Sequence, residues 1–117
     1  MIQGLYKMNL NVRFLKLEIY IPETNLGELQ GVLQKEDAGH IGNYDSCMAV
    51  SRVTGMWRPL QGSNPFIGSE NEVSEGPELK VEVRIRAEAL ESTIDSIKRI
   101  HPYEEPLINV IPLLSED

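Results

Sequence analysis

The 117-residue chain has little of what builds covalent cross-links, membrane spans or nucleic-acid surfaces. Its single cysteine, Cys47, excludes an internal disulfide and fits a reducing compartment, so we expect a cytoplasmic protein. Eleven Lys and Arg stand against eighteen Asp and Glu, and the resulting net charge of −7 argues against nucleic acid and anionic membranes as partners. No apolar run approaches the ~20 residues of a membrane helix.

The length suits one domain with a single core. We assign residues 15–114 to this domain and residues 1–14 to an N-terminal extension outside the core. The first eleven residues mix polar and apolar side chains and lack the apolar core of a signal peptide. Met1 and Met8 are both candidate starts. Residues 61–77 are rich in Gly, Ser, Asn, Pro and Glu, which predicts a long loop of the kind that is often functional.

Four segments have the side-chain pattern of strands. Residues 15–21 and 79–86 alternate apolar with charged or polar side chains, the period of a half-buried strand, and residues 107–113 are mostly apolar. The fourth predicted strand, residues 47–53, carries Cys47 and ends in a break or bulge at Thr54-Gly55.

Two segments have helical periodicity. The first follows Thr24, a candidate N-cap, and ends before Gly39, a candidate C-cap. Gly27 and Gly31 weaken it by roughly 1 kcal/mol each relative to Ala, so it needs tertiary packing. The second spans residues 88–100, with acidic residues in its first turn and basic residues in its last, as the helix dipole favours.

The two halves of the chain align at an offset of 64, which places Lys16 on Lys80 and Leu26 on Leu90. Two strand–helix–strand halves predict an α+β fold of the ferredoxin-like split β-α-β type (βαββαβ), with two helices on one face of an antiparallel sheet. The residues expected to share the core are Leu17, Ile19, Leu26, Val81, Val83, Leu90, Ile94 and Ile97. The other sheet face, with Tyr20 and Arg84, is left to solvent or a partner.

Three motifs carry a family resemblance: Gly-His-Ile-Gly-Asn-Tyr-Asp-x-Cys at 39–47, Arg-Pro-Leu-x-Gly-x-Asn-Pro-x-Ile-Gly at 58–68, and His-Pro-Tyr-Glu-Glu-Pro at 101–106. With them the chain resembles the PII-like, YqfO-type insert domain of the Nif-three-like (YbgI/YqfO) proteins. The last motif also resembles the CutA divalent-ion tolerance proteins. The resemblance implies a PII/CutA-like fold and a homotrimer, but not the two-metal chemistry of the Nif-three-like flanking domains. Trp57 stands where the family usually has Phe.

The same motifs supply the candidate site residues. The predicted ligand-binding residues are His40, Asn43, Tyr44, Asp45, Arg58, Tyr103, Glu104 and Glu105. His40, Cys47, His101 and Glu104 form a candidate metal set, because imidazole and thiolate suit borderline divalent ions. Their spacing matches no zinc template, and a lone cysteine on a strand is usually a small core residue. No oxyanion hole accompanies Cys47, so we predict no catalytic residue.

We therefore predict a non-enzymatic, oligomeric binding or regulatory module of the PII/CutA-like kind. Its candidate cargo is a divalent metal ion or a small ligand held at a cleft between subunits. Two alternatives stay open from the sequence: a structural adaptor for another protein partner, and a small enzyme that uses the His/Cys/Glu cluster.

Overall fold

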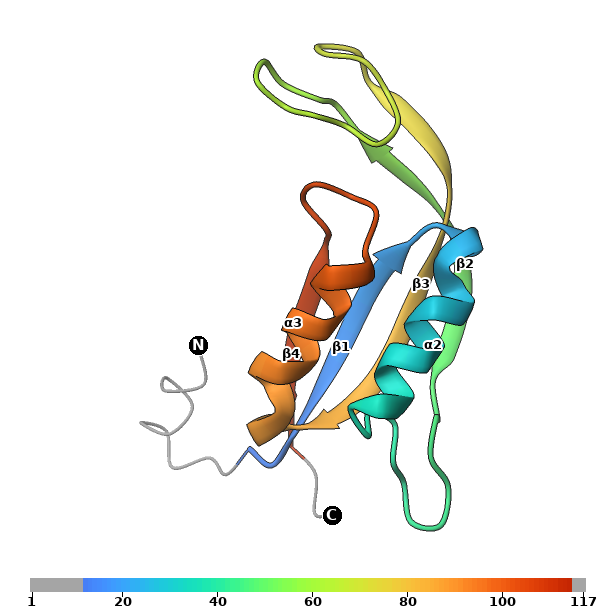
Figure 1. The fold of residues 1–117 in the computed structure, drawn as a ribbon, viewed down its shortest axis with the longest axis vertical. Coiled ribbons are helices and arrows are strands. Elements are labelled where there is room, and N and C mark those ends of the chain that lie inside the picture. Colours follow the sequence, from blue (N-terminus) through green and yellow to red (C-terminus); the bar gives the residue numbers. More distant parts are fainter. Residues whose placement is uncertain (1–11, 115–117) are drawn as a thin grey trace.

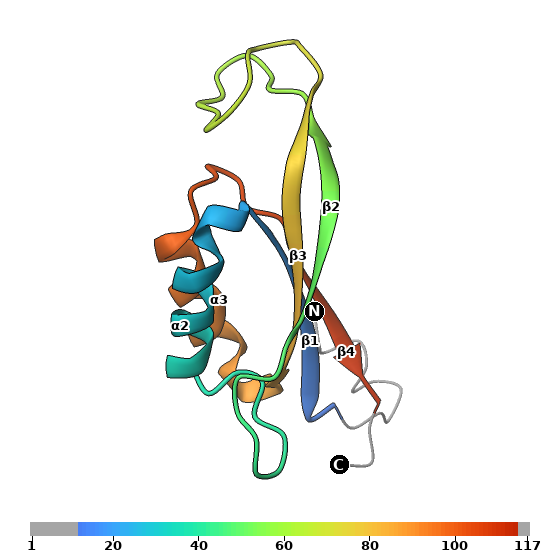
Figure 2. The ribbon, with the colours of Figure 1, turned by 90° about the vertical axis from the view of Figure 1, so that its right-hand side faces the viewer.

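The computed structural model describes residues 12–114. The elements are β1 (Phe14–Ile21), α2 (Leu26–Lys35), β2 (Ala49–Trp57), β3 (Ser74–Arg86), α3 (Leu90–Ile100) and β4 (Ile108–Leu113). The four strands form one antiparallel sheet in the order β2-β3-β1-β4. Both helices cover the same face of this sheet (Figures 1 and 2). The predicted ferredoxin-like α+β fold is confirmed.

The core lies between the two central strands and the helices. Leu17 pairs with Val83 and Ile19 with Val81, and none of these side chains is more than 2% exposed. Because side chains alternate along a strand, this register sends every second residue of β1 and β3 into the core. The helices close it from above, with Ile97 fully buried. All eight residues expected in the core are buried or packed against it.

The internal repeat extends to the helix starts. A 3-10 turn at Glu23–Asn25 leads into α2, and a matching turn at Ala87–Ala89 leads into α3. The N-cap position of α2 is Asn25, whose side chain makes no capping hydrogen bond. The prediction of Thr24 as N-cap is therefore wrong, because the 3-10 turn carries the chain into the helix and shifts its start by one residue.

The end of α2 also differs from the prediction. Asp37 has φ +57°, and the N–H groups of Asp37 and Ala38 donate to the carbonyls of Gln34 and Leu33. This is the hydrogen-bond pattern of a Schellman motif, with Asp37 in the position usually held by glycine. Gly39 is thus not the C-cap; at φ +77° it lies where a Cβ atom would be 2.4 Å from the carbonyl oxygen of Cys47.

The β2–β3 pair continues beyond the helix-covered part of the sheet as a long arm, which we call the extension (residues 53–78). The predicted break at Thr54-Gly55 is wrong, since pairing runs without interruption through Gly55↔Gly76 to Trp57↔Ser74. Strand β3 begins at Ser74, so the connecting loop spans residues 58–73 and not 61–77. Figure 2 shows this loop curling back toward the helix side.

The predicted N-terminal extension falls mostly on residues 1–11, which lie outside the described residues. Val12 is already buried, at 4% exposure, and Phe14 begins β1. Within residues 12–114, no helix has both the length and the apolar character needed to span a membrane.

Candidate functional site

The structure places the two histidine-containing motifs at opposite ends of the sheet. Helices α2 and α3 run in opposite directions, so their C-termini point to different ends of the molecule (Figure 1). Gly39 donates its N–H to the carbonyl of Arg84, whereas the imidazole of His101 bonds the carbonyl of Tyr20, at the other end of β1. His40 and His101, two members of the candidate metal set, therefore lie at opposite ends of the sheet within one chain.

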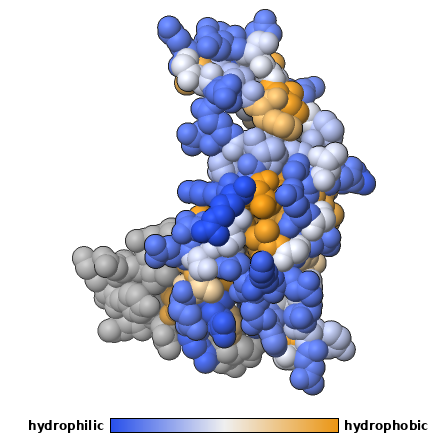
Figure 3. Space-filling view, in the orientation of Figure 1, coloured by the Kyte–Doolittle hydropathy of each residue, from blue (hydrophilic) through white to orange (hydrophobic). Residues whose placement is uncertain are grey.

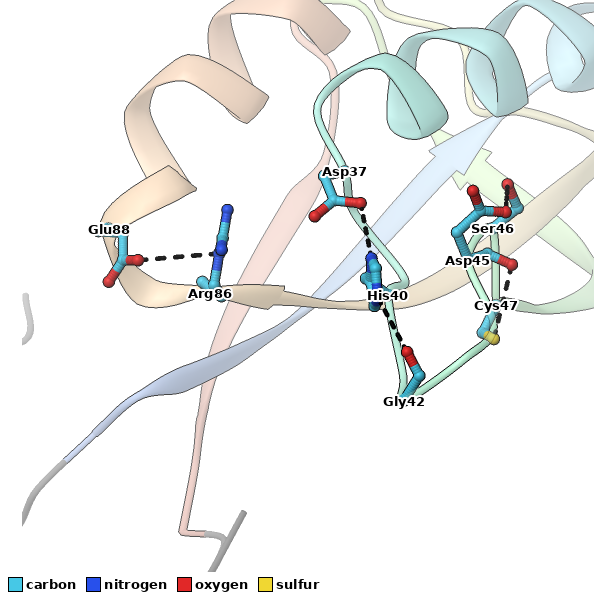
Figure 4. Close-up of polar contacts among 8 residues, drawn as sticks. All are labelled: Asp37, His40, Gly42, Asp45, Ser46, Cys47, Arg86 and Glu88. Carbon is cyan, nitrogen blue, oxygen red and sulfur yellow. Dashed lines mark hydrogen bonds and ion pairs between the residues drawn. The ribbon is translucent and has the colours of Figure 1, made fainter.

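The first motif forms an exposed hairpin whose histidine faces only hydrogen-bond acceptors (Figure 4). The Nδ1 atom of His40 lies 2.9 Å from Oδ1 of Asp37, and Nε2 lies 3.0 Å from the carbonyl oxygen of Gly42. Both partners only accept, so both ring nitrogens donate, as in an imidazolium. The Asp37 carboxylate, followed by the Gly42 carbonyl, raises the pKa of His40. The Cys47 thiol bonds the carbonyl of Asp45 at 3.7 Å, in the loop before β2 and not on a strand.

The second motif holds its histidine in the interior. His101 is 8% exposed; its Nε2 donates to the carbonyl of Tyr20 at 2.7 Å, and its Nδ1 accepts the N–H of Tyr103 at 3.2 Å. A carbonyl only accepts and an N–H only donates, which assigns the neutral Nε2–H tautomer. Burial lowers the pKa of His101, in agreement with this assignment.

These contacts contradict a metal cluster built from His40, Cys47, His101 and Glu104 in one chain. A metal ligand needs a ring nitrogen with a free lone pair, and both histidines already use both nitrogens. Within residues 12–114, no three His, Cys, Asp or Glu side chains gather in a metal-binding arrangement. The sequence motifs are better explained by the local structure that each histidine holds in place.

Four of the eight predicted ligand-binding residues do share one place. Arg58, Tyr103, Glu104 and Glu105 line a cleft of about 500 Å³ between the extension with its loop and the turn at residues 101–107. The other four, His40, Asn43, Tyr44 and Asp45, lie in the hairpin at the far end of the sheet. The cleft volume lies in the range of small-molecule sites.

A hydrogen bond fixes the turn to the extension across this cleft. The hydroxyl of Tyr103 donates to Oε2 of Glu78 at 3.1 Å. Burial, followed by the charge of Glu78 and this hydrogen bond, raises the pKa of Tyr103 to about 12. Gly55 makes room for the carboxylate, since a Cβ atom there would be 2.3 Å from Oε1 of Glu78. The phenol is therefore a neutral donor at physiological pH, and Glu78 is oriented by it.

Two further contacts hold the 58–73 loop over the cleft. The indole Nε1 of Trp57 donates to the carbonyl of Ile67 at 2.9 Å, and the N–H of Asn64 donates to the Glu104 carboxylate. The ring of Phe66 lies 6.1 Å from that of Tyr103, tilted by 53°. Groups from the end of β2, the 58–73 loop and the 101–107 turn thus form one wall of the cleft.

Several residues of this cleft could not be predicted from the sequence. Tyr20 and Glu78 lie on facing strands that reach the cleft only through the sheet register, and no motif marks them. Ser63 and Phe66 occupy unspecified positions of the 58–68 motif, so the motif marks their loop but not these two residues.

Known proteins are similar to this chain in both sequence and fold. The chain is 36% identical over 101 residues to a "GTP cyclohydrolase 1 type 2 homolog" of Halalkalibacterium halodurans, covering 86% of this chain and 27% of that protein. A protein of the same name from Bacillus subtilis is 32% identical over 98 residues, covering 84% of this chain and 26% of that protein. A Bacillus cereus protein related to NIF3 superposes with a TM-score of 0.78 at 30% identity, covering 89% of this chain and 26% of the other. No protein-family model matches.

The chain resembles one segment of the NIF3-related proteins. The resemblance predicted from the three motifs is thereby confirmed, and the chain spans about a quarter of the length of the relatives it matches. The divalent ion tolerance protein CutA1 from Ehrlichia chaffeensis also superposes, with a TM-score of 0.67 at 16% identity over 91% of this chain and 86% of that one. This second likeness confirms the PII/CutA-like fold.

Proposed function

We propose that this chain is a non-catalytic, oligomeric binding or regulatory module whose ligand site is the cleft between the 58–73 loop and the 101–107 turn. The observation that supports it is the cleft itself, in which apolar walls surround a few convergent polar groups. The groups that a small enzyme would need are engaged elsewhere: the Cys47 thiol bonds its own loop and both histidines are fully hydrogen-bonded. A cytoplasmic location, suggested by the lone free cysteine, belongs to this proposal.

A homotrimer is the second part of the proposal. The extension exposes large apolar side chains, including Met56 at 69% and Val73 at 74%, away from the core of its own chain. Apolar surface also shows on this arm in Figure 3. Such surface, together with the open edges of β2 and β4, favours contact with further copies. Light scattering on the purified chain at micromolar concentration is expected to give about three chains per particle; a monomer would contradict it.

The binding role is tested with ligand panels. Thermal unfolding is measured with small aromatic amines, alcohols and carboxylates, and at least one class is expected to raise the midpoint. The cleft is then filled by Leu60→Trp, because Leu60 lines the cleft and is 56% exposed. Loss of the ligand effect in this variant, with an unchanged midpoint in the absence of ligand, supports the cleft as the site. A chain that responds to no class, or a Leu60→Trp variant that responds equally, would refute the proposed site.

A further inference from the structure

We infer that the cleft selects a small organic cation with an aromatic or compact apolar body. The inference rests on the proposed function and goes beyond it by assigning the chemical class of the ligand. Two independent features of the cleft carry it, a concentration of aromatic rings and an excess of carboxylates, and a buried hydroxyl without a hydrogen-bond partner accompanies them.

The aromatic rings are concentrated at this one place. The chain has two Phe, four Tyr and one Trp, and four of these line the cleft: Tyr20, Trp57, Phe66 and Tyr103. The rings of Phe66 and Tyr103 form a tilted pair, with centroids 6.1 Å apart, in the lining of the cleft. Ring faces carry partial negative charge, so they attract cations as well as apolar groups. Aromatic walls alone would also accept a neutral ligand. The charged side chains that line the cleft decide between a neutral and a cationic ligand.

Carboxylates outnumber cations around the rings. Glu78, Glu104 and Glu105 line the cleft, against the single guanidinium of Arg58. Two of these acids are held in place, Glu78 by the Tyr103 hydroxyl and Glu104 by the N–H of Asn64. Carboxylates beside apolar walls favour a charged N–H donor and repel an anion, because a hydrogen bond between two ionised groups is stronger than one between neutral groups.

Ser63 adds a polar group to this cleft. The residue lines the cleft, and its Oγ atom is buried without a hydrogen-bond partner within the described residues. A buried hydroxyl without a partner carries a desolvation cost that a ligand group reaching it can remove. Because a hydroxyl both donates and accepts, Ser63 fits an ammonium ligand, while the carboxylates and the rings set the preference for a cation.

The test uses three probes of nearly equal size: 2-phenylethylamine, 2-phenylethanol and phenylacetate. Near pH 7 they are a cation, a neutral molecule and an anion. The chain has one tryptophan, Trp57, and it lines the cleft, so its fluorescence reports occupancy and calorimetry supplies the Kd. The amine is expected to bind about tenfold more tightly than the alcohol, with a Kd on the order of 1 mM, and more weakly as salt rises.

Matched variants separate local charge from total charge. Glu105→Gln is expected to weaken the amine several-fold and leave the alcohol unchanged. Glu91→Gln changes the net charge equally on the exposed surface of α3, and it should leave both Kd values unchanged.

The possible outcomes are distinct. If the alcohol matches the amine, the cleft binds ligands as proposed but the cation inference is wrong. If phenylacetate binds best, Arg58 sets the selectivity and the inference is also overturned. If none of the three probes binds, both the cation inference and the proposed ligand site fail.

Discussion

The helix-covered centre of the sheet and the extension use the same backbone pairing but bury very different side chains. In the centre, Leu17 and Val83 face each other with at most 2% exposure. In the extension the facing pairs include Gly55 with Gly76 and the 69%-exposed Met56 with Glu75. The centre is stabilised by burial of apolar side chains, whereas the extension is stabilised by hydrogen bonds between its strands and by a few side-chain hydrogen bonds. The side chains of the extension are not needed to fill the core, so this part of the domain can carry a binding site.

The largest expected effect separates the two parts directly. Ile97 is a fully buried residue of α3, and Ile97→Ala should lower the free energy of unfolding by about 2–5 kcal/mol. Leu90 is only half-buried, so Leu90→Ala should cost less than Ile97→Ala. Met56→Ala, on the extension, should change the stability by no more than about 0.5 kcal/mol. Urea unfolding measures all three; an equal loss for Met56→Ala would mean that the arm belongs to the cooperative core.

Glycine substitutions sharpen the comparison. Gly39→Ala should cost about 1–3 kcal/mol, because φ is +77° and the new Cβ atom meets rigid backbone at Cys47. Gly55→Ala meets only the flexible end of the Glu78 side chain, so the cost should stay below about 1 kcal/mol while the Tyr103–Glu78 hydrogen bond is disturbed. Gly31→Ala, in open space on α2, is the control and should stabilise by roughly 1 kcal/mol. The unfolding midpoint should therefore be lowest for Gly39→Ala, intermediate for Gly55→Ala and highest for Gly31→Ala, and this order tests the close approaches at Gly39 and Gly55.

The two histidines should give pH dependences of opposite sign. The pKa of His101 is lowered by burial, so the unfolded state binds more protons, and stability present above about pH 6.5 falls as the pH drops through the folded pKa. His101→Gln should flatten this dependence. The pKa of His40 is raised by Asp37, so its contribution is present below about pH 6.5 and is lost as the pH rises through the folded pKa. Thermal midpoints of His40→Gln and His101→Gln from pH 5 to 8 check both signs.

The smallest effect on global stability is expected at the tether of the arm. Trp57→Phe removes the hydrogen bond from Nε1 to the carbonyl of Ile67, and the local cost should be about 0.5–1.5 kcal/mol. Amide exchange should accelerate within residues 58–73 and stay unchanged in α3, because the arm opens without unfolding the centre. Acceleration that reaches Ile97 would show instead that arm and centre open together.

Much of the fold could be predicted because its signals are local. Alternation in residues 15–21 and 79–86, together with helical periodicity near Leu90, indicates which faces are buried, and the repeat at offset 64 gives the topology. The failures lie where local propensity competes with context. A 3-10 turn replaces the Thr24 cap, and Asp37 takes the left-handed position expected for glycine. At Gly55, glycine allows a close approach of Glu78 and does not interrupt the strand.

The sequence by itself determined the fold, the core and the three motifs, because these depend on side-chain period and chain order. Only the tertiary structure decided which motif residues meet. The two helices run antiparallel, so His40 and His101 lie at opposite ends of the sheet, and the strand register brings Tyr20 and Glu78 to Tyr103 across long stretches of sequence. Residues that are far apart in the sequence come together through strand register and helix packing, and these depend on contacts along the whole chain.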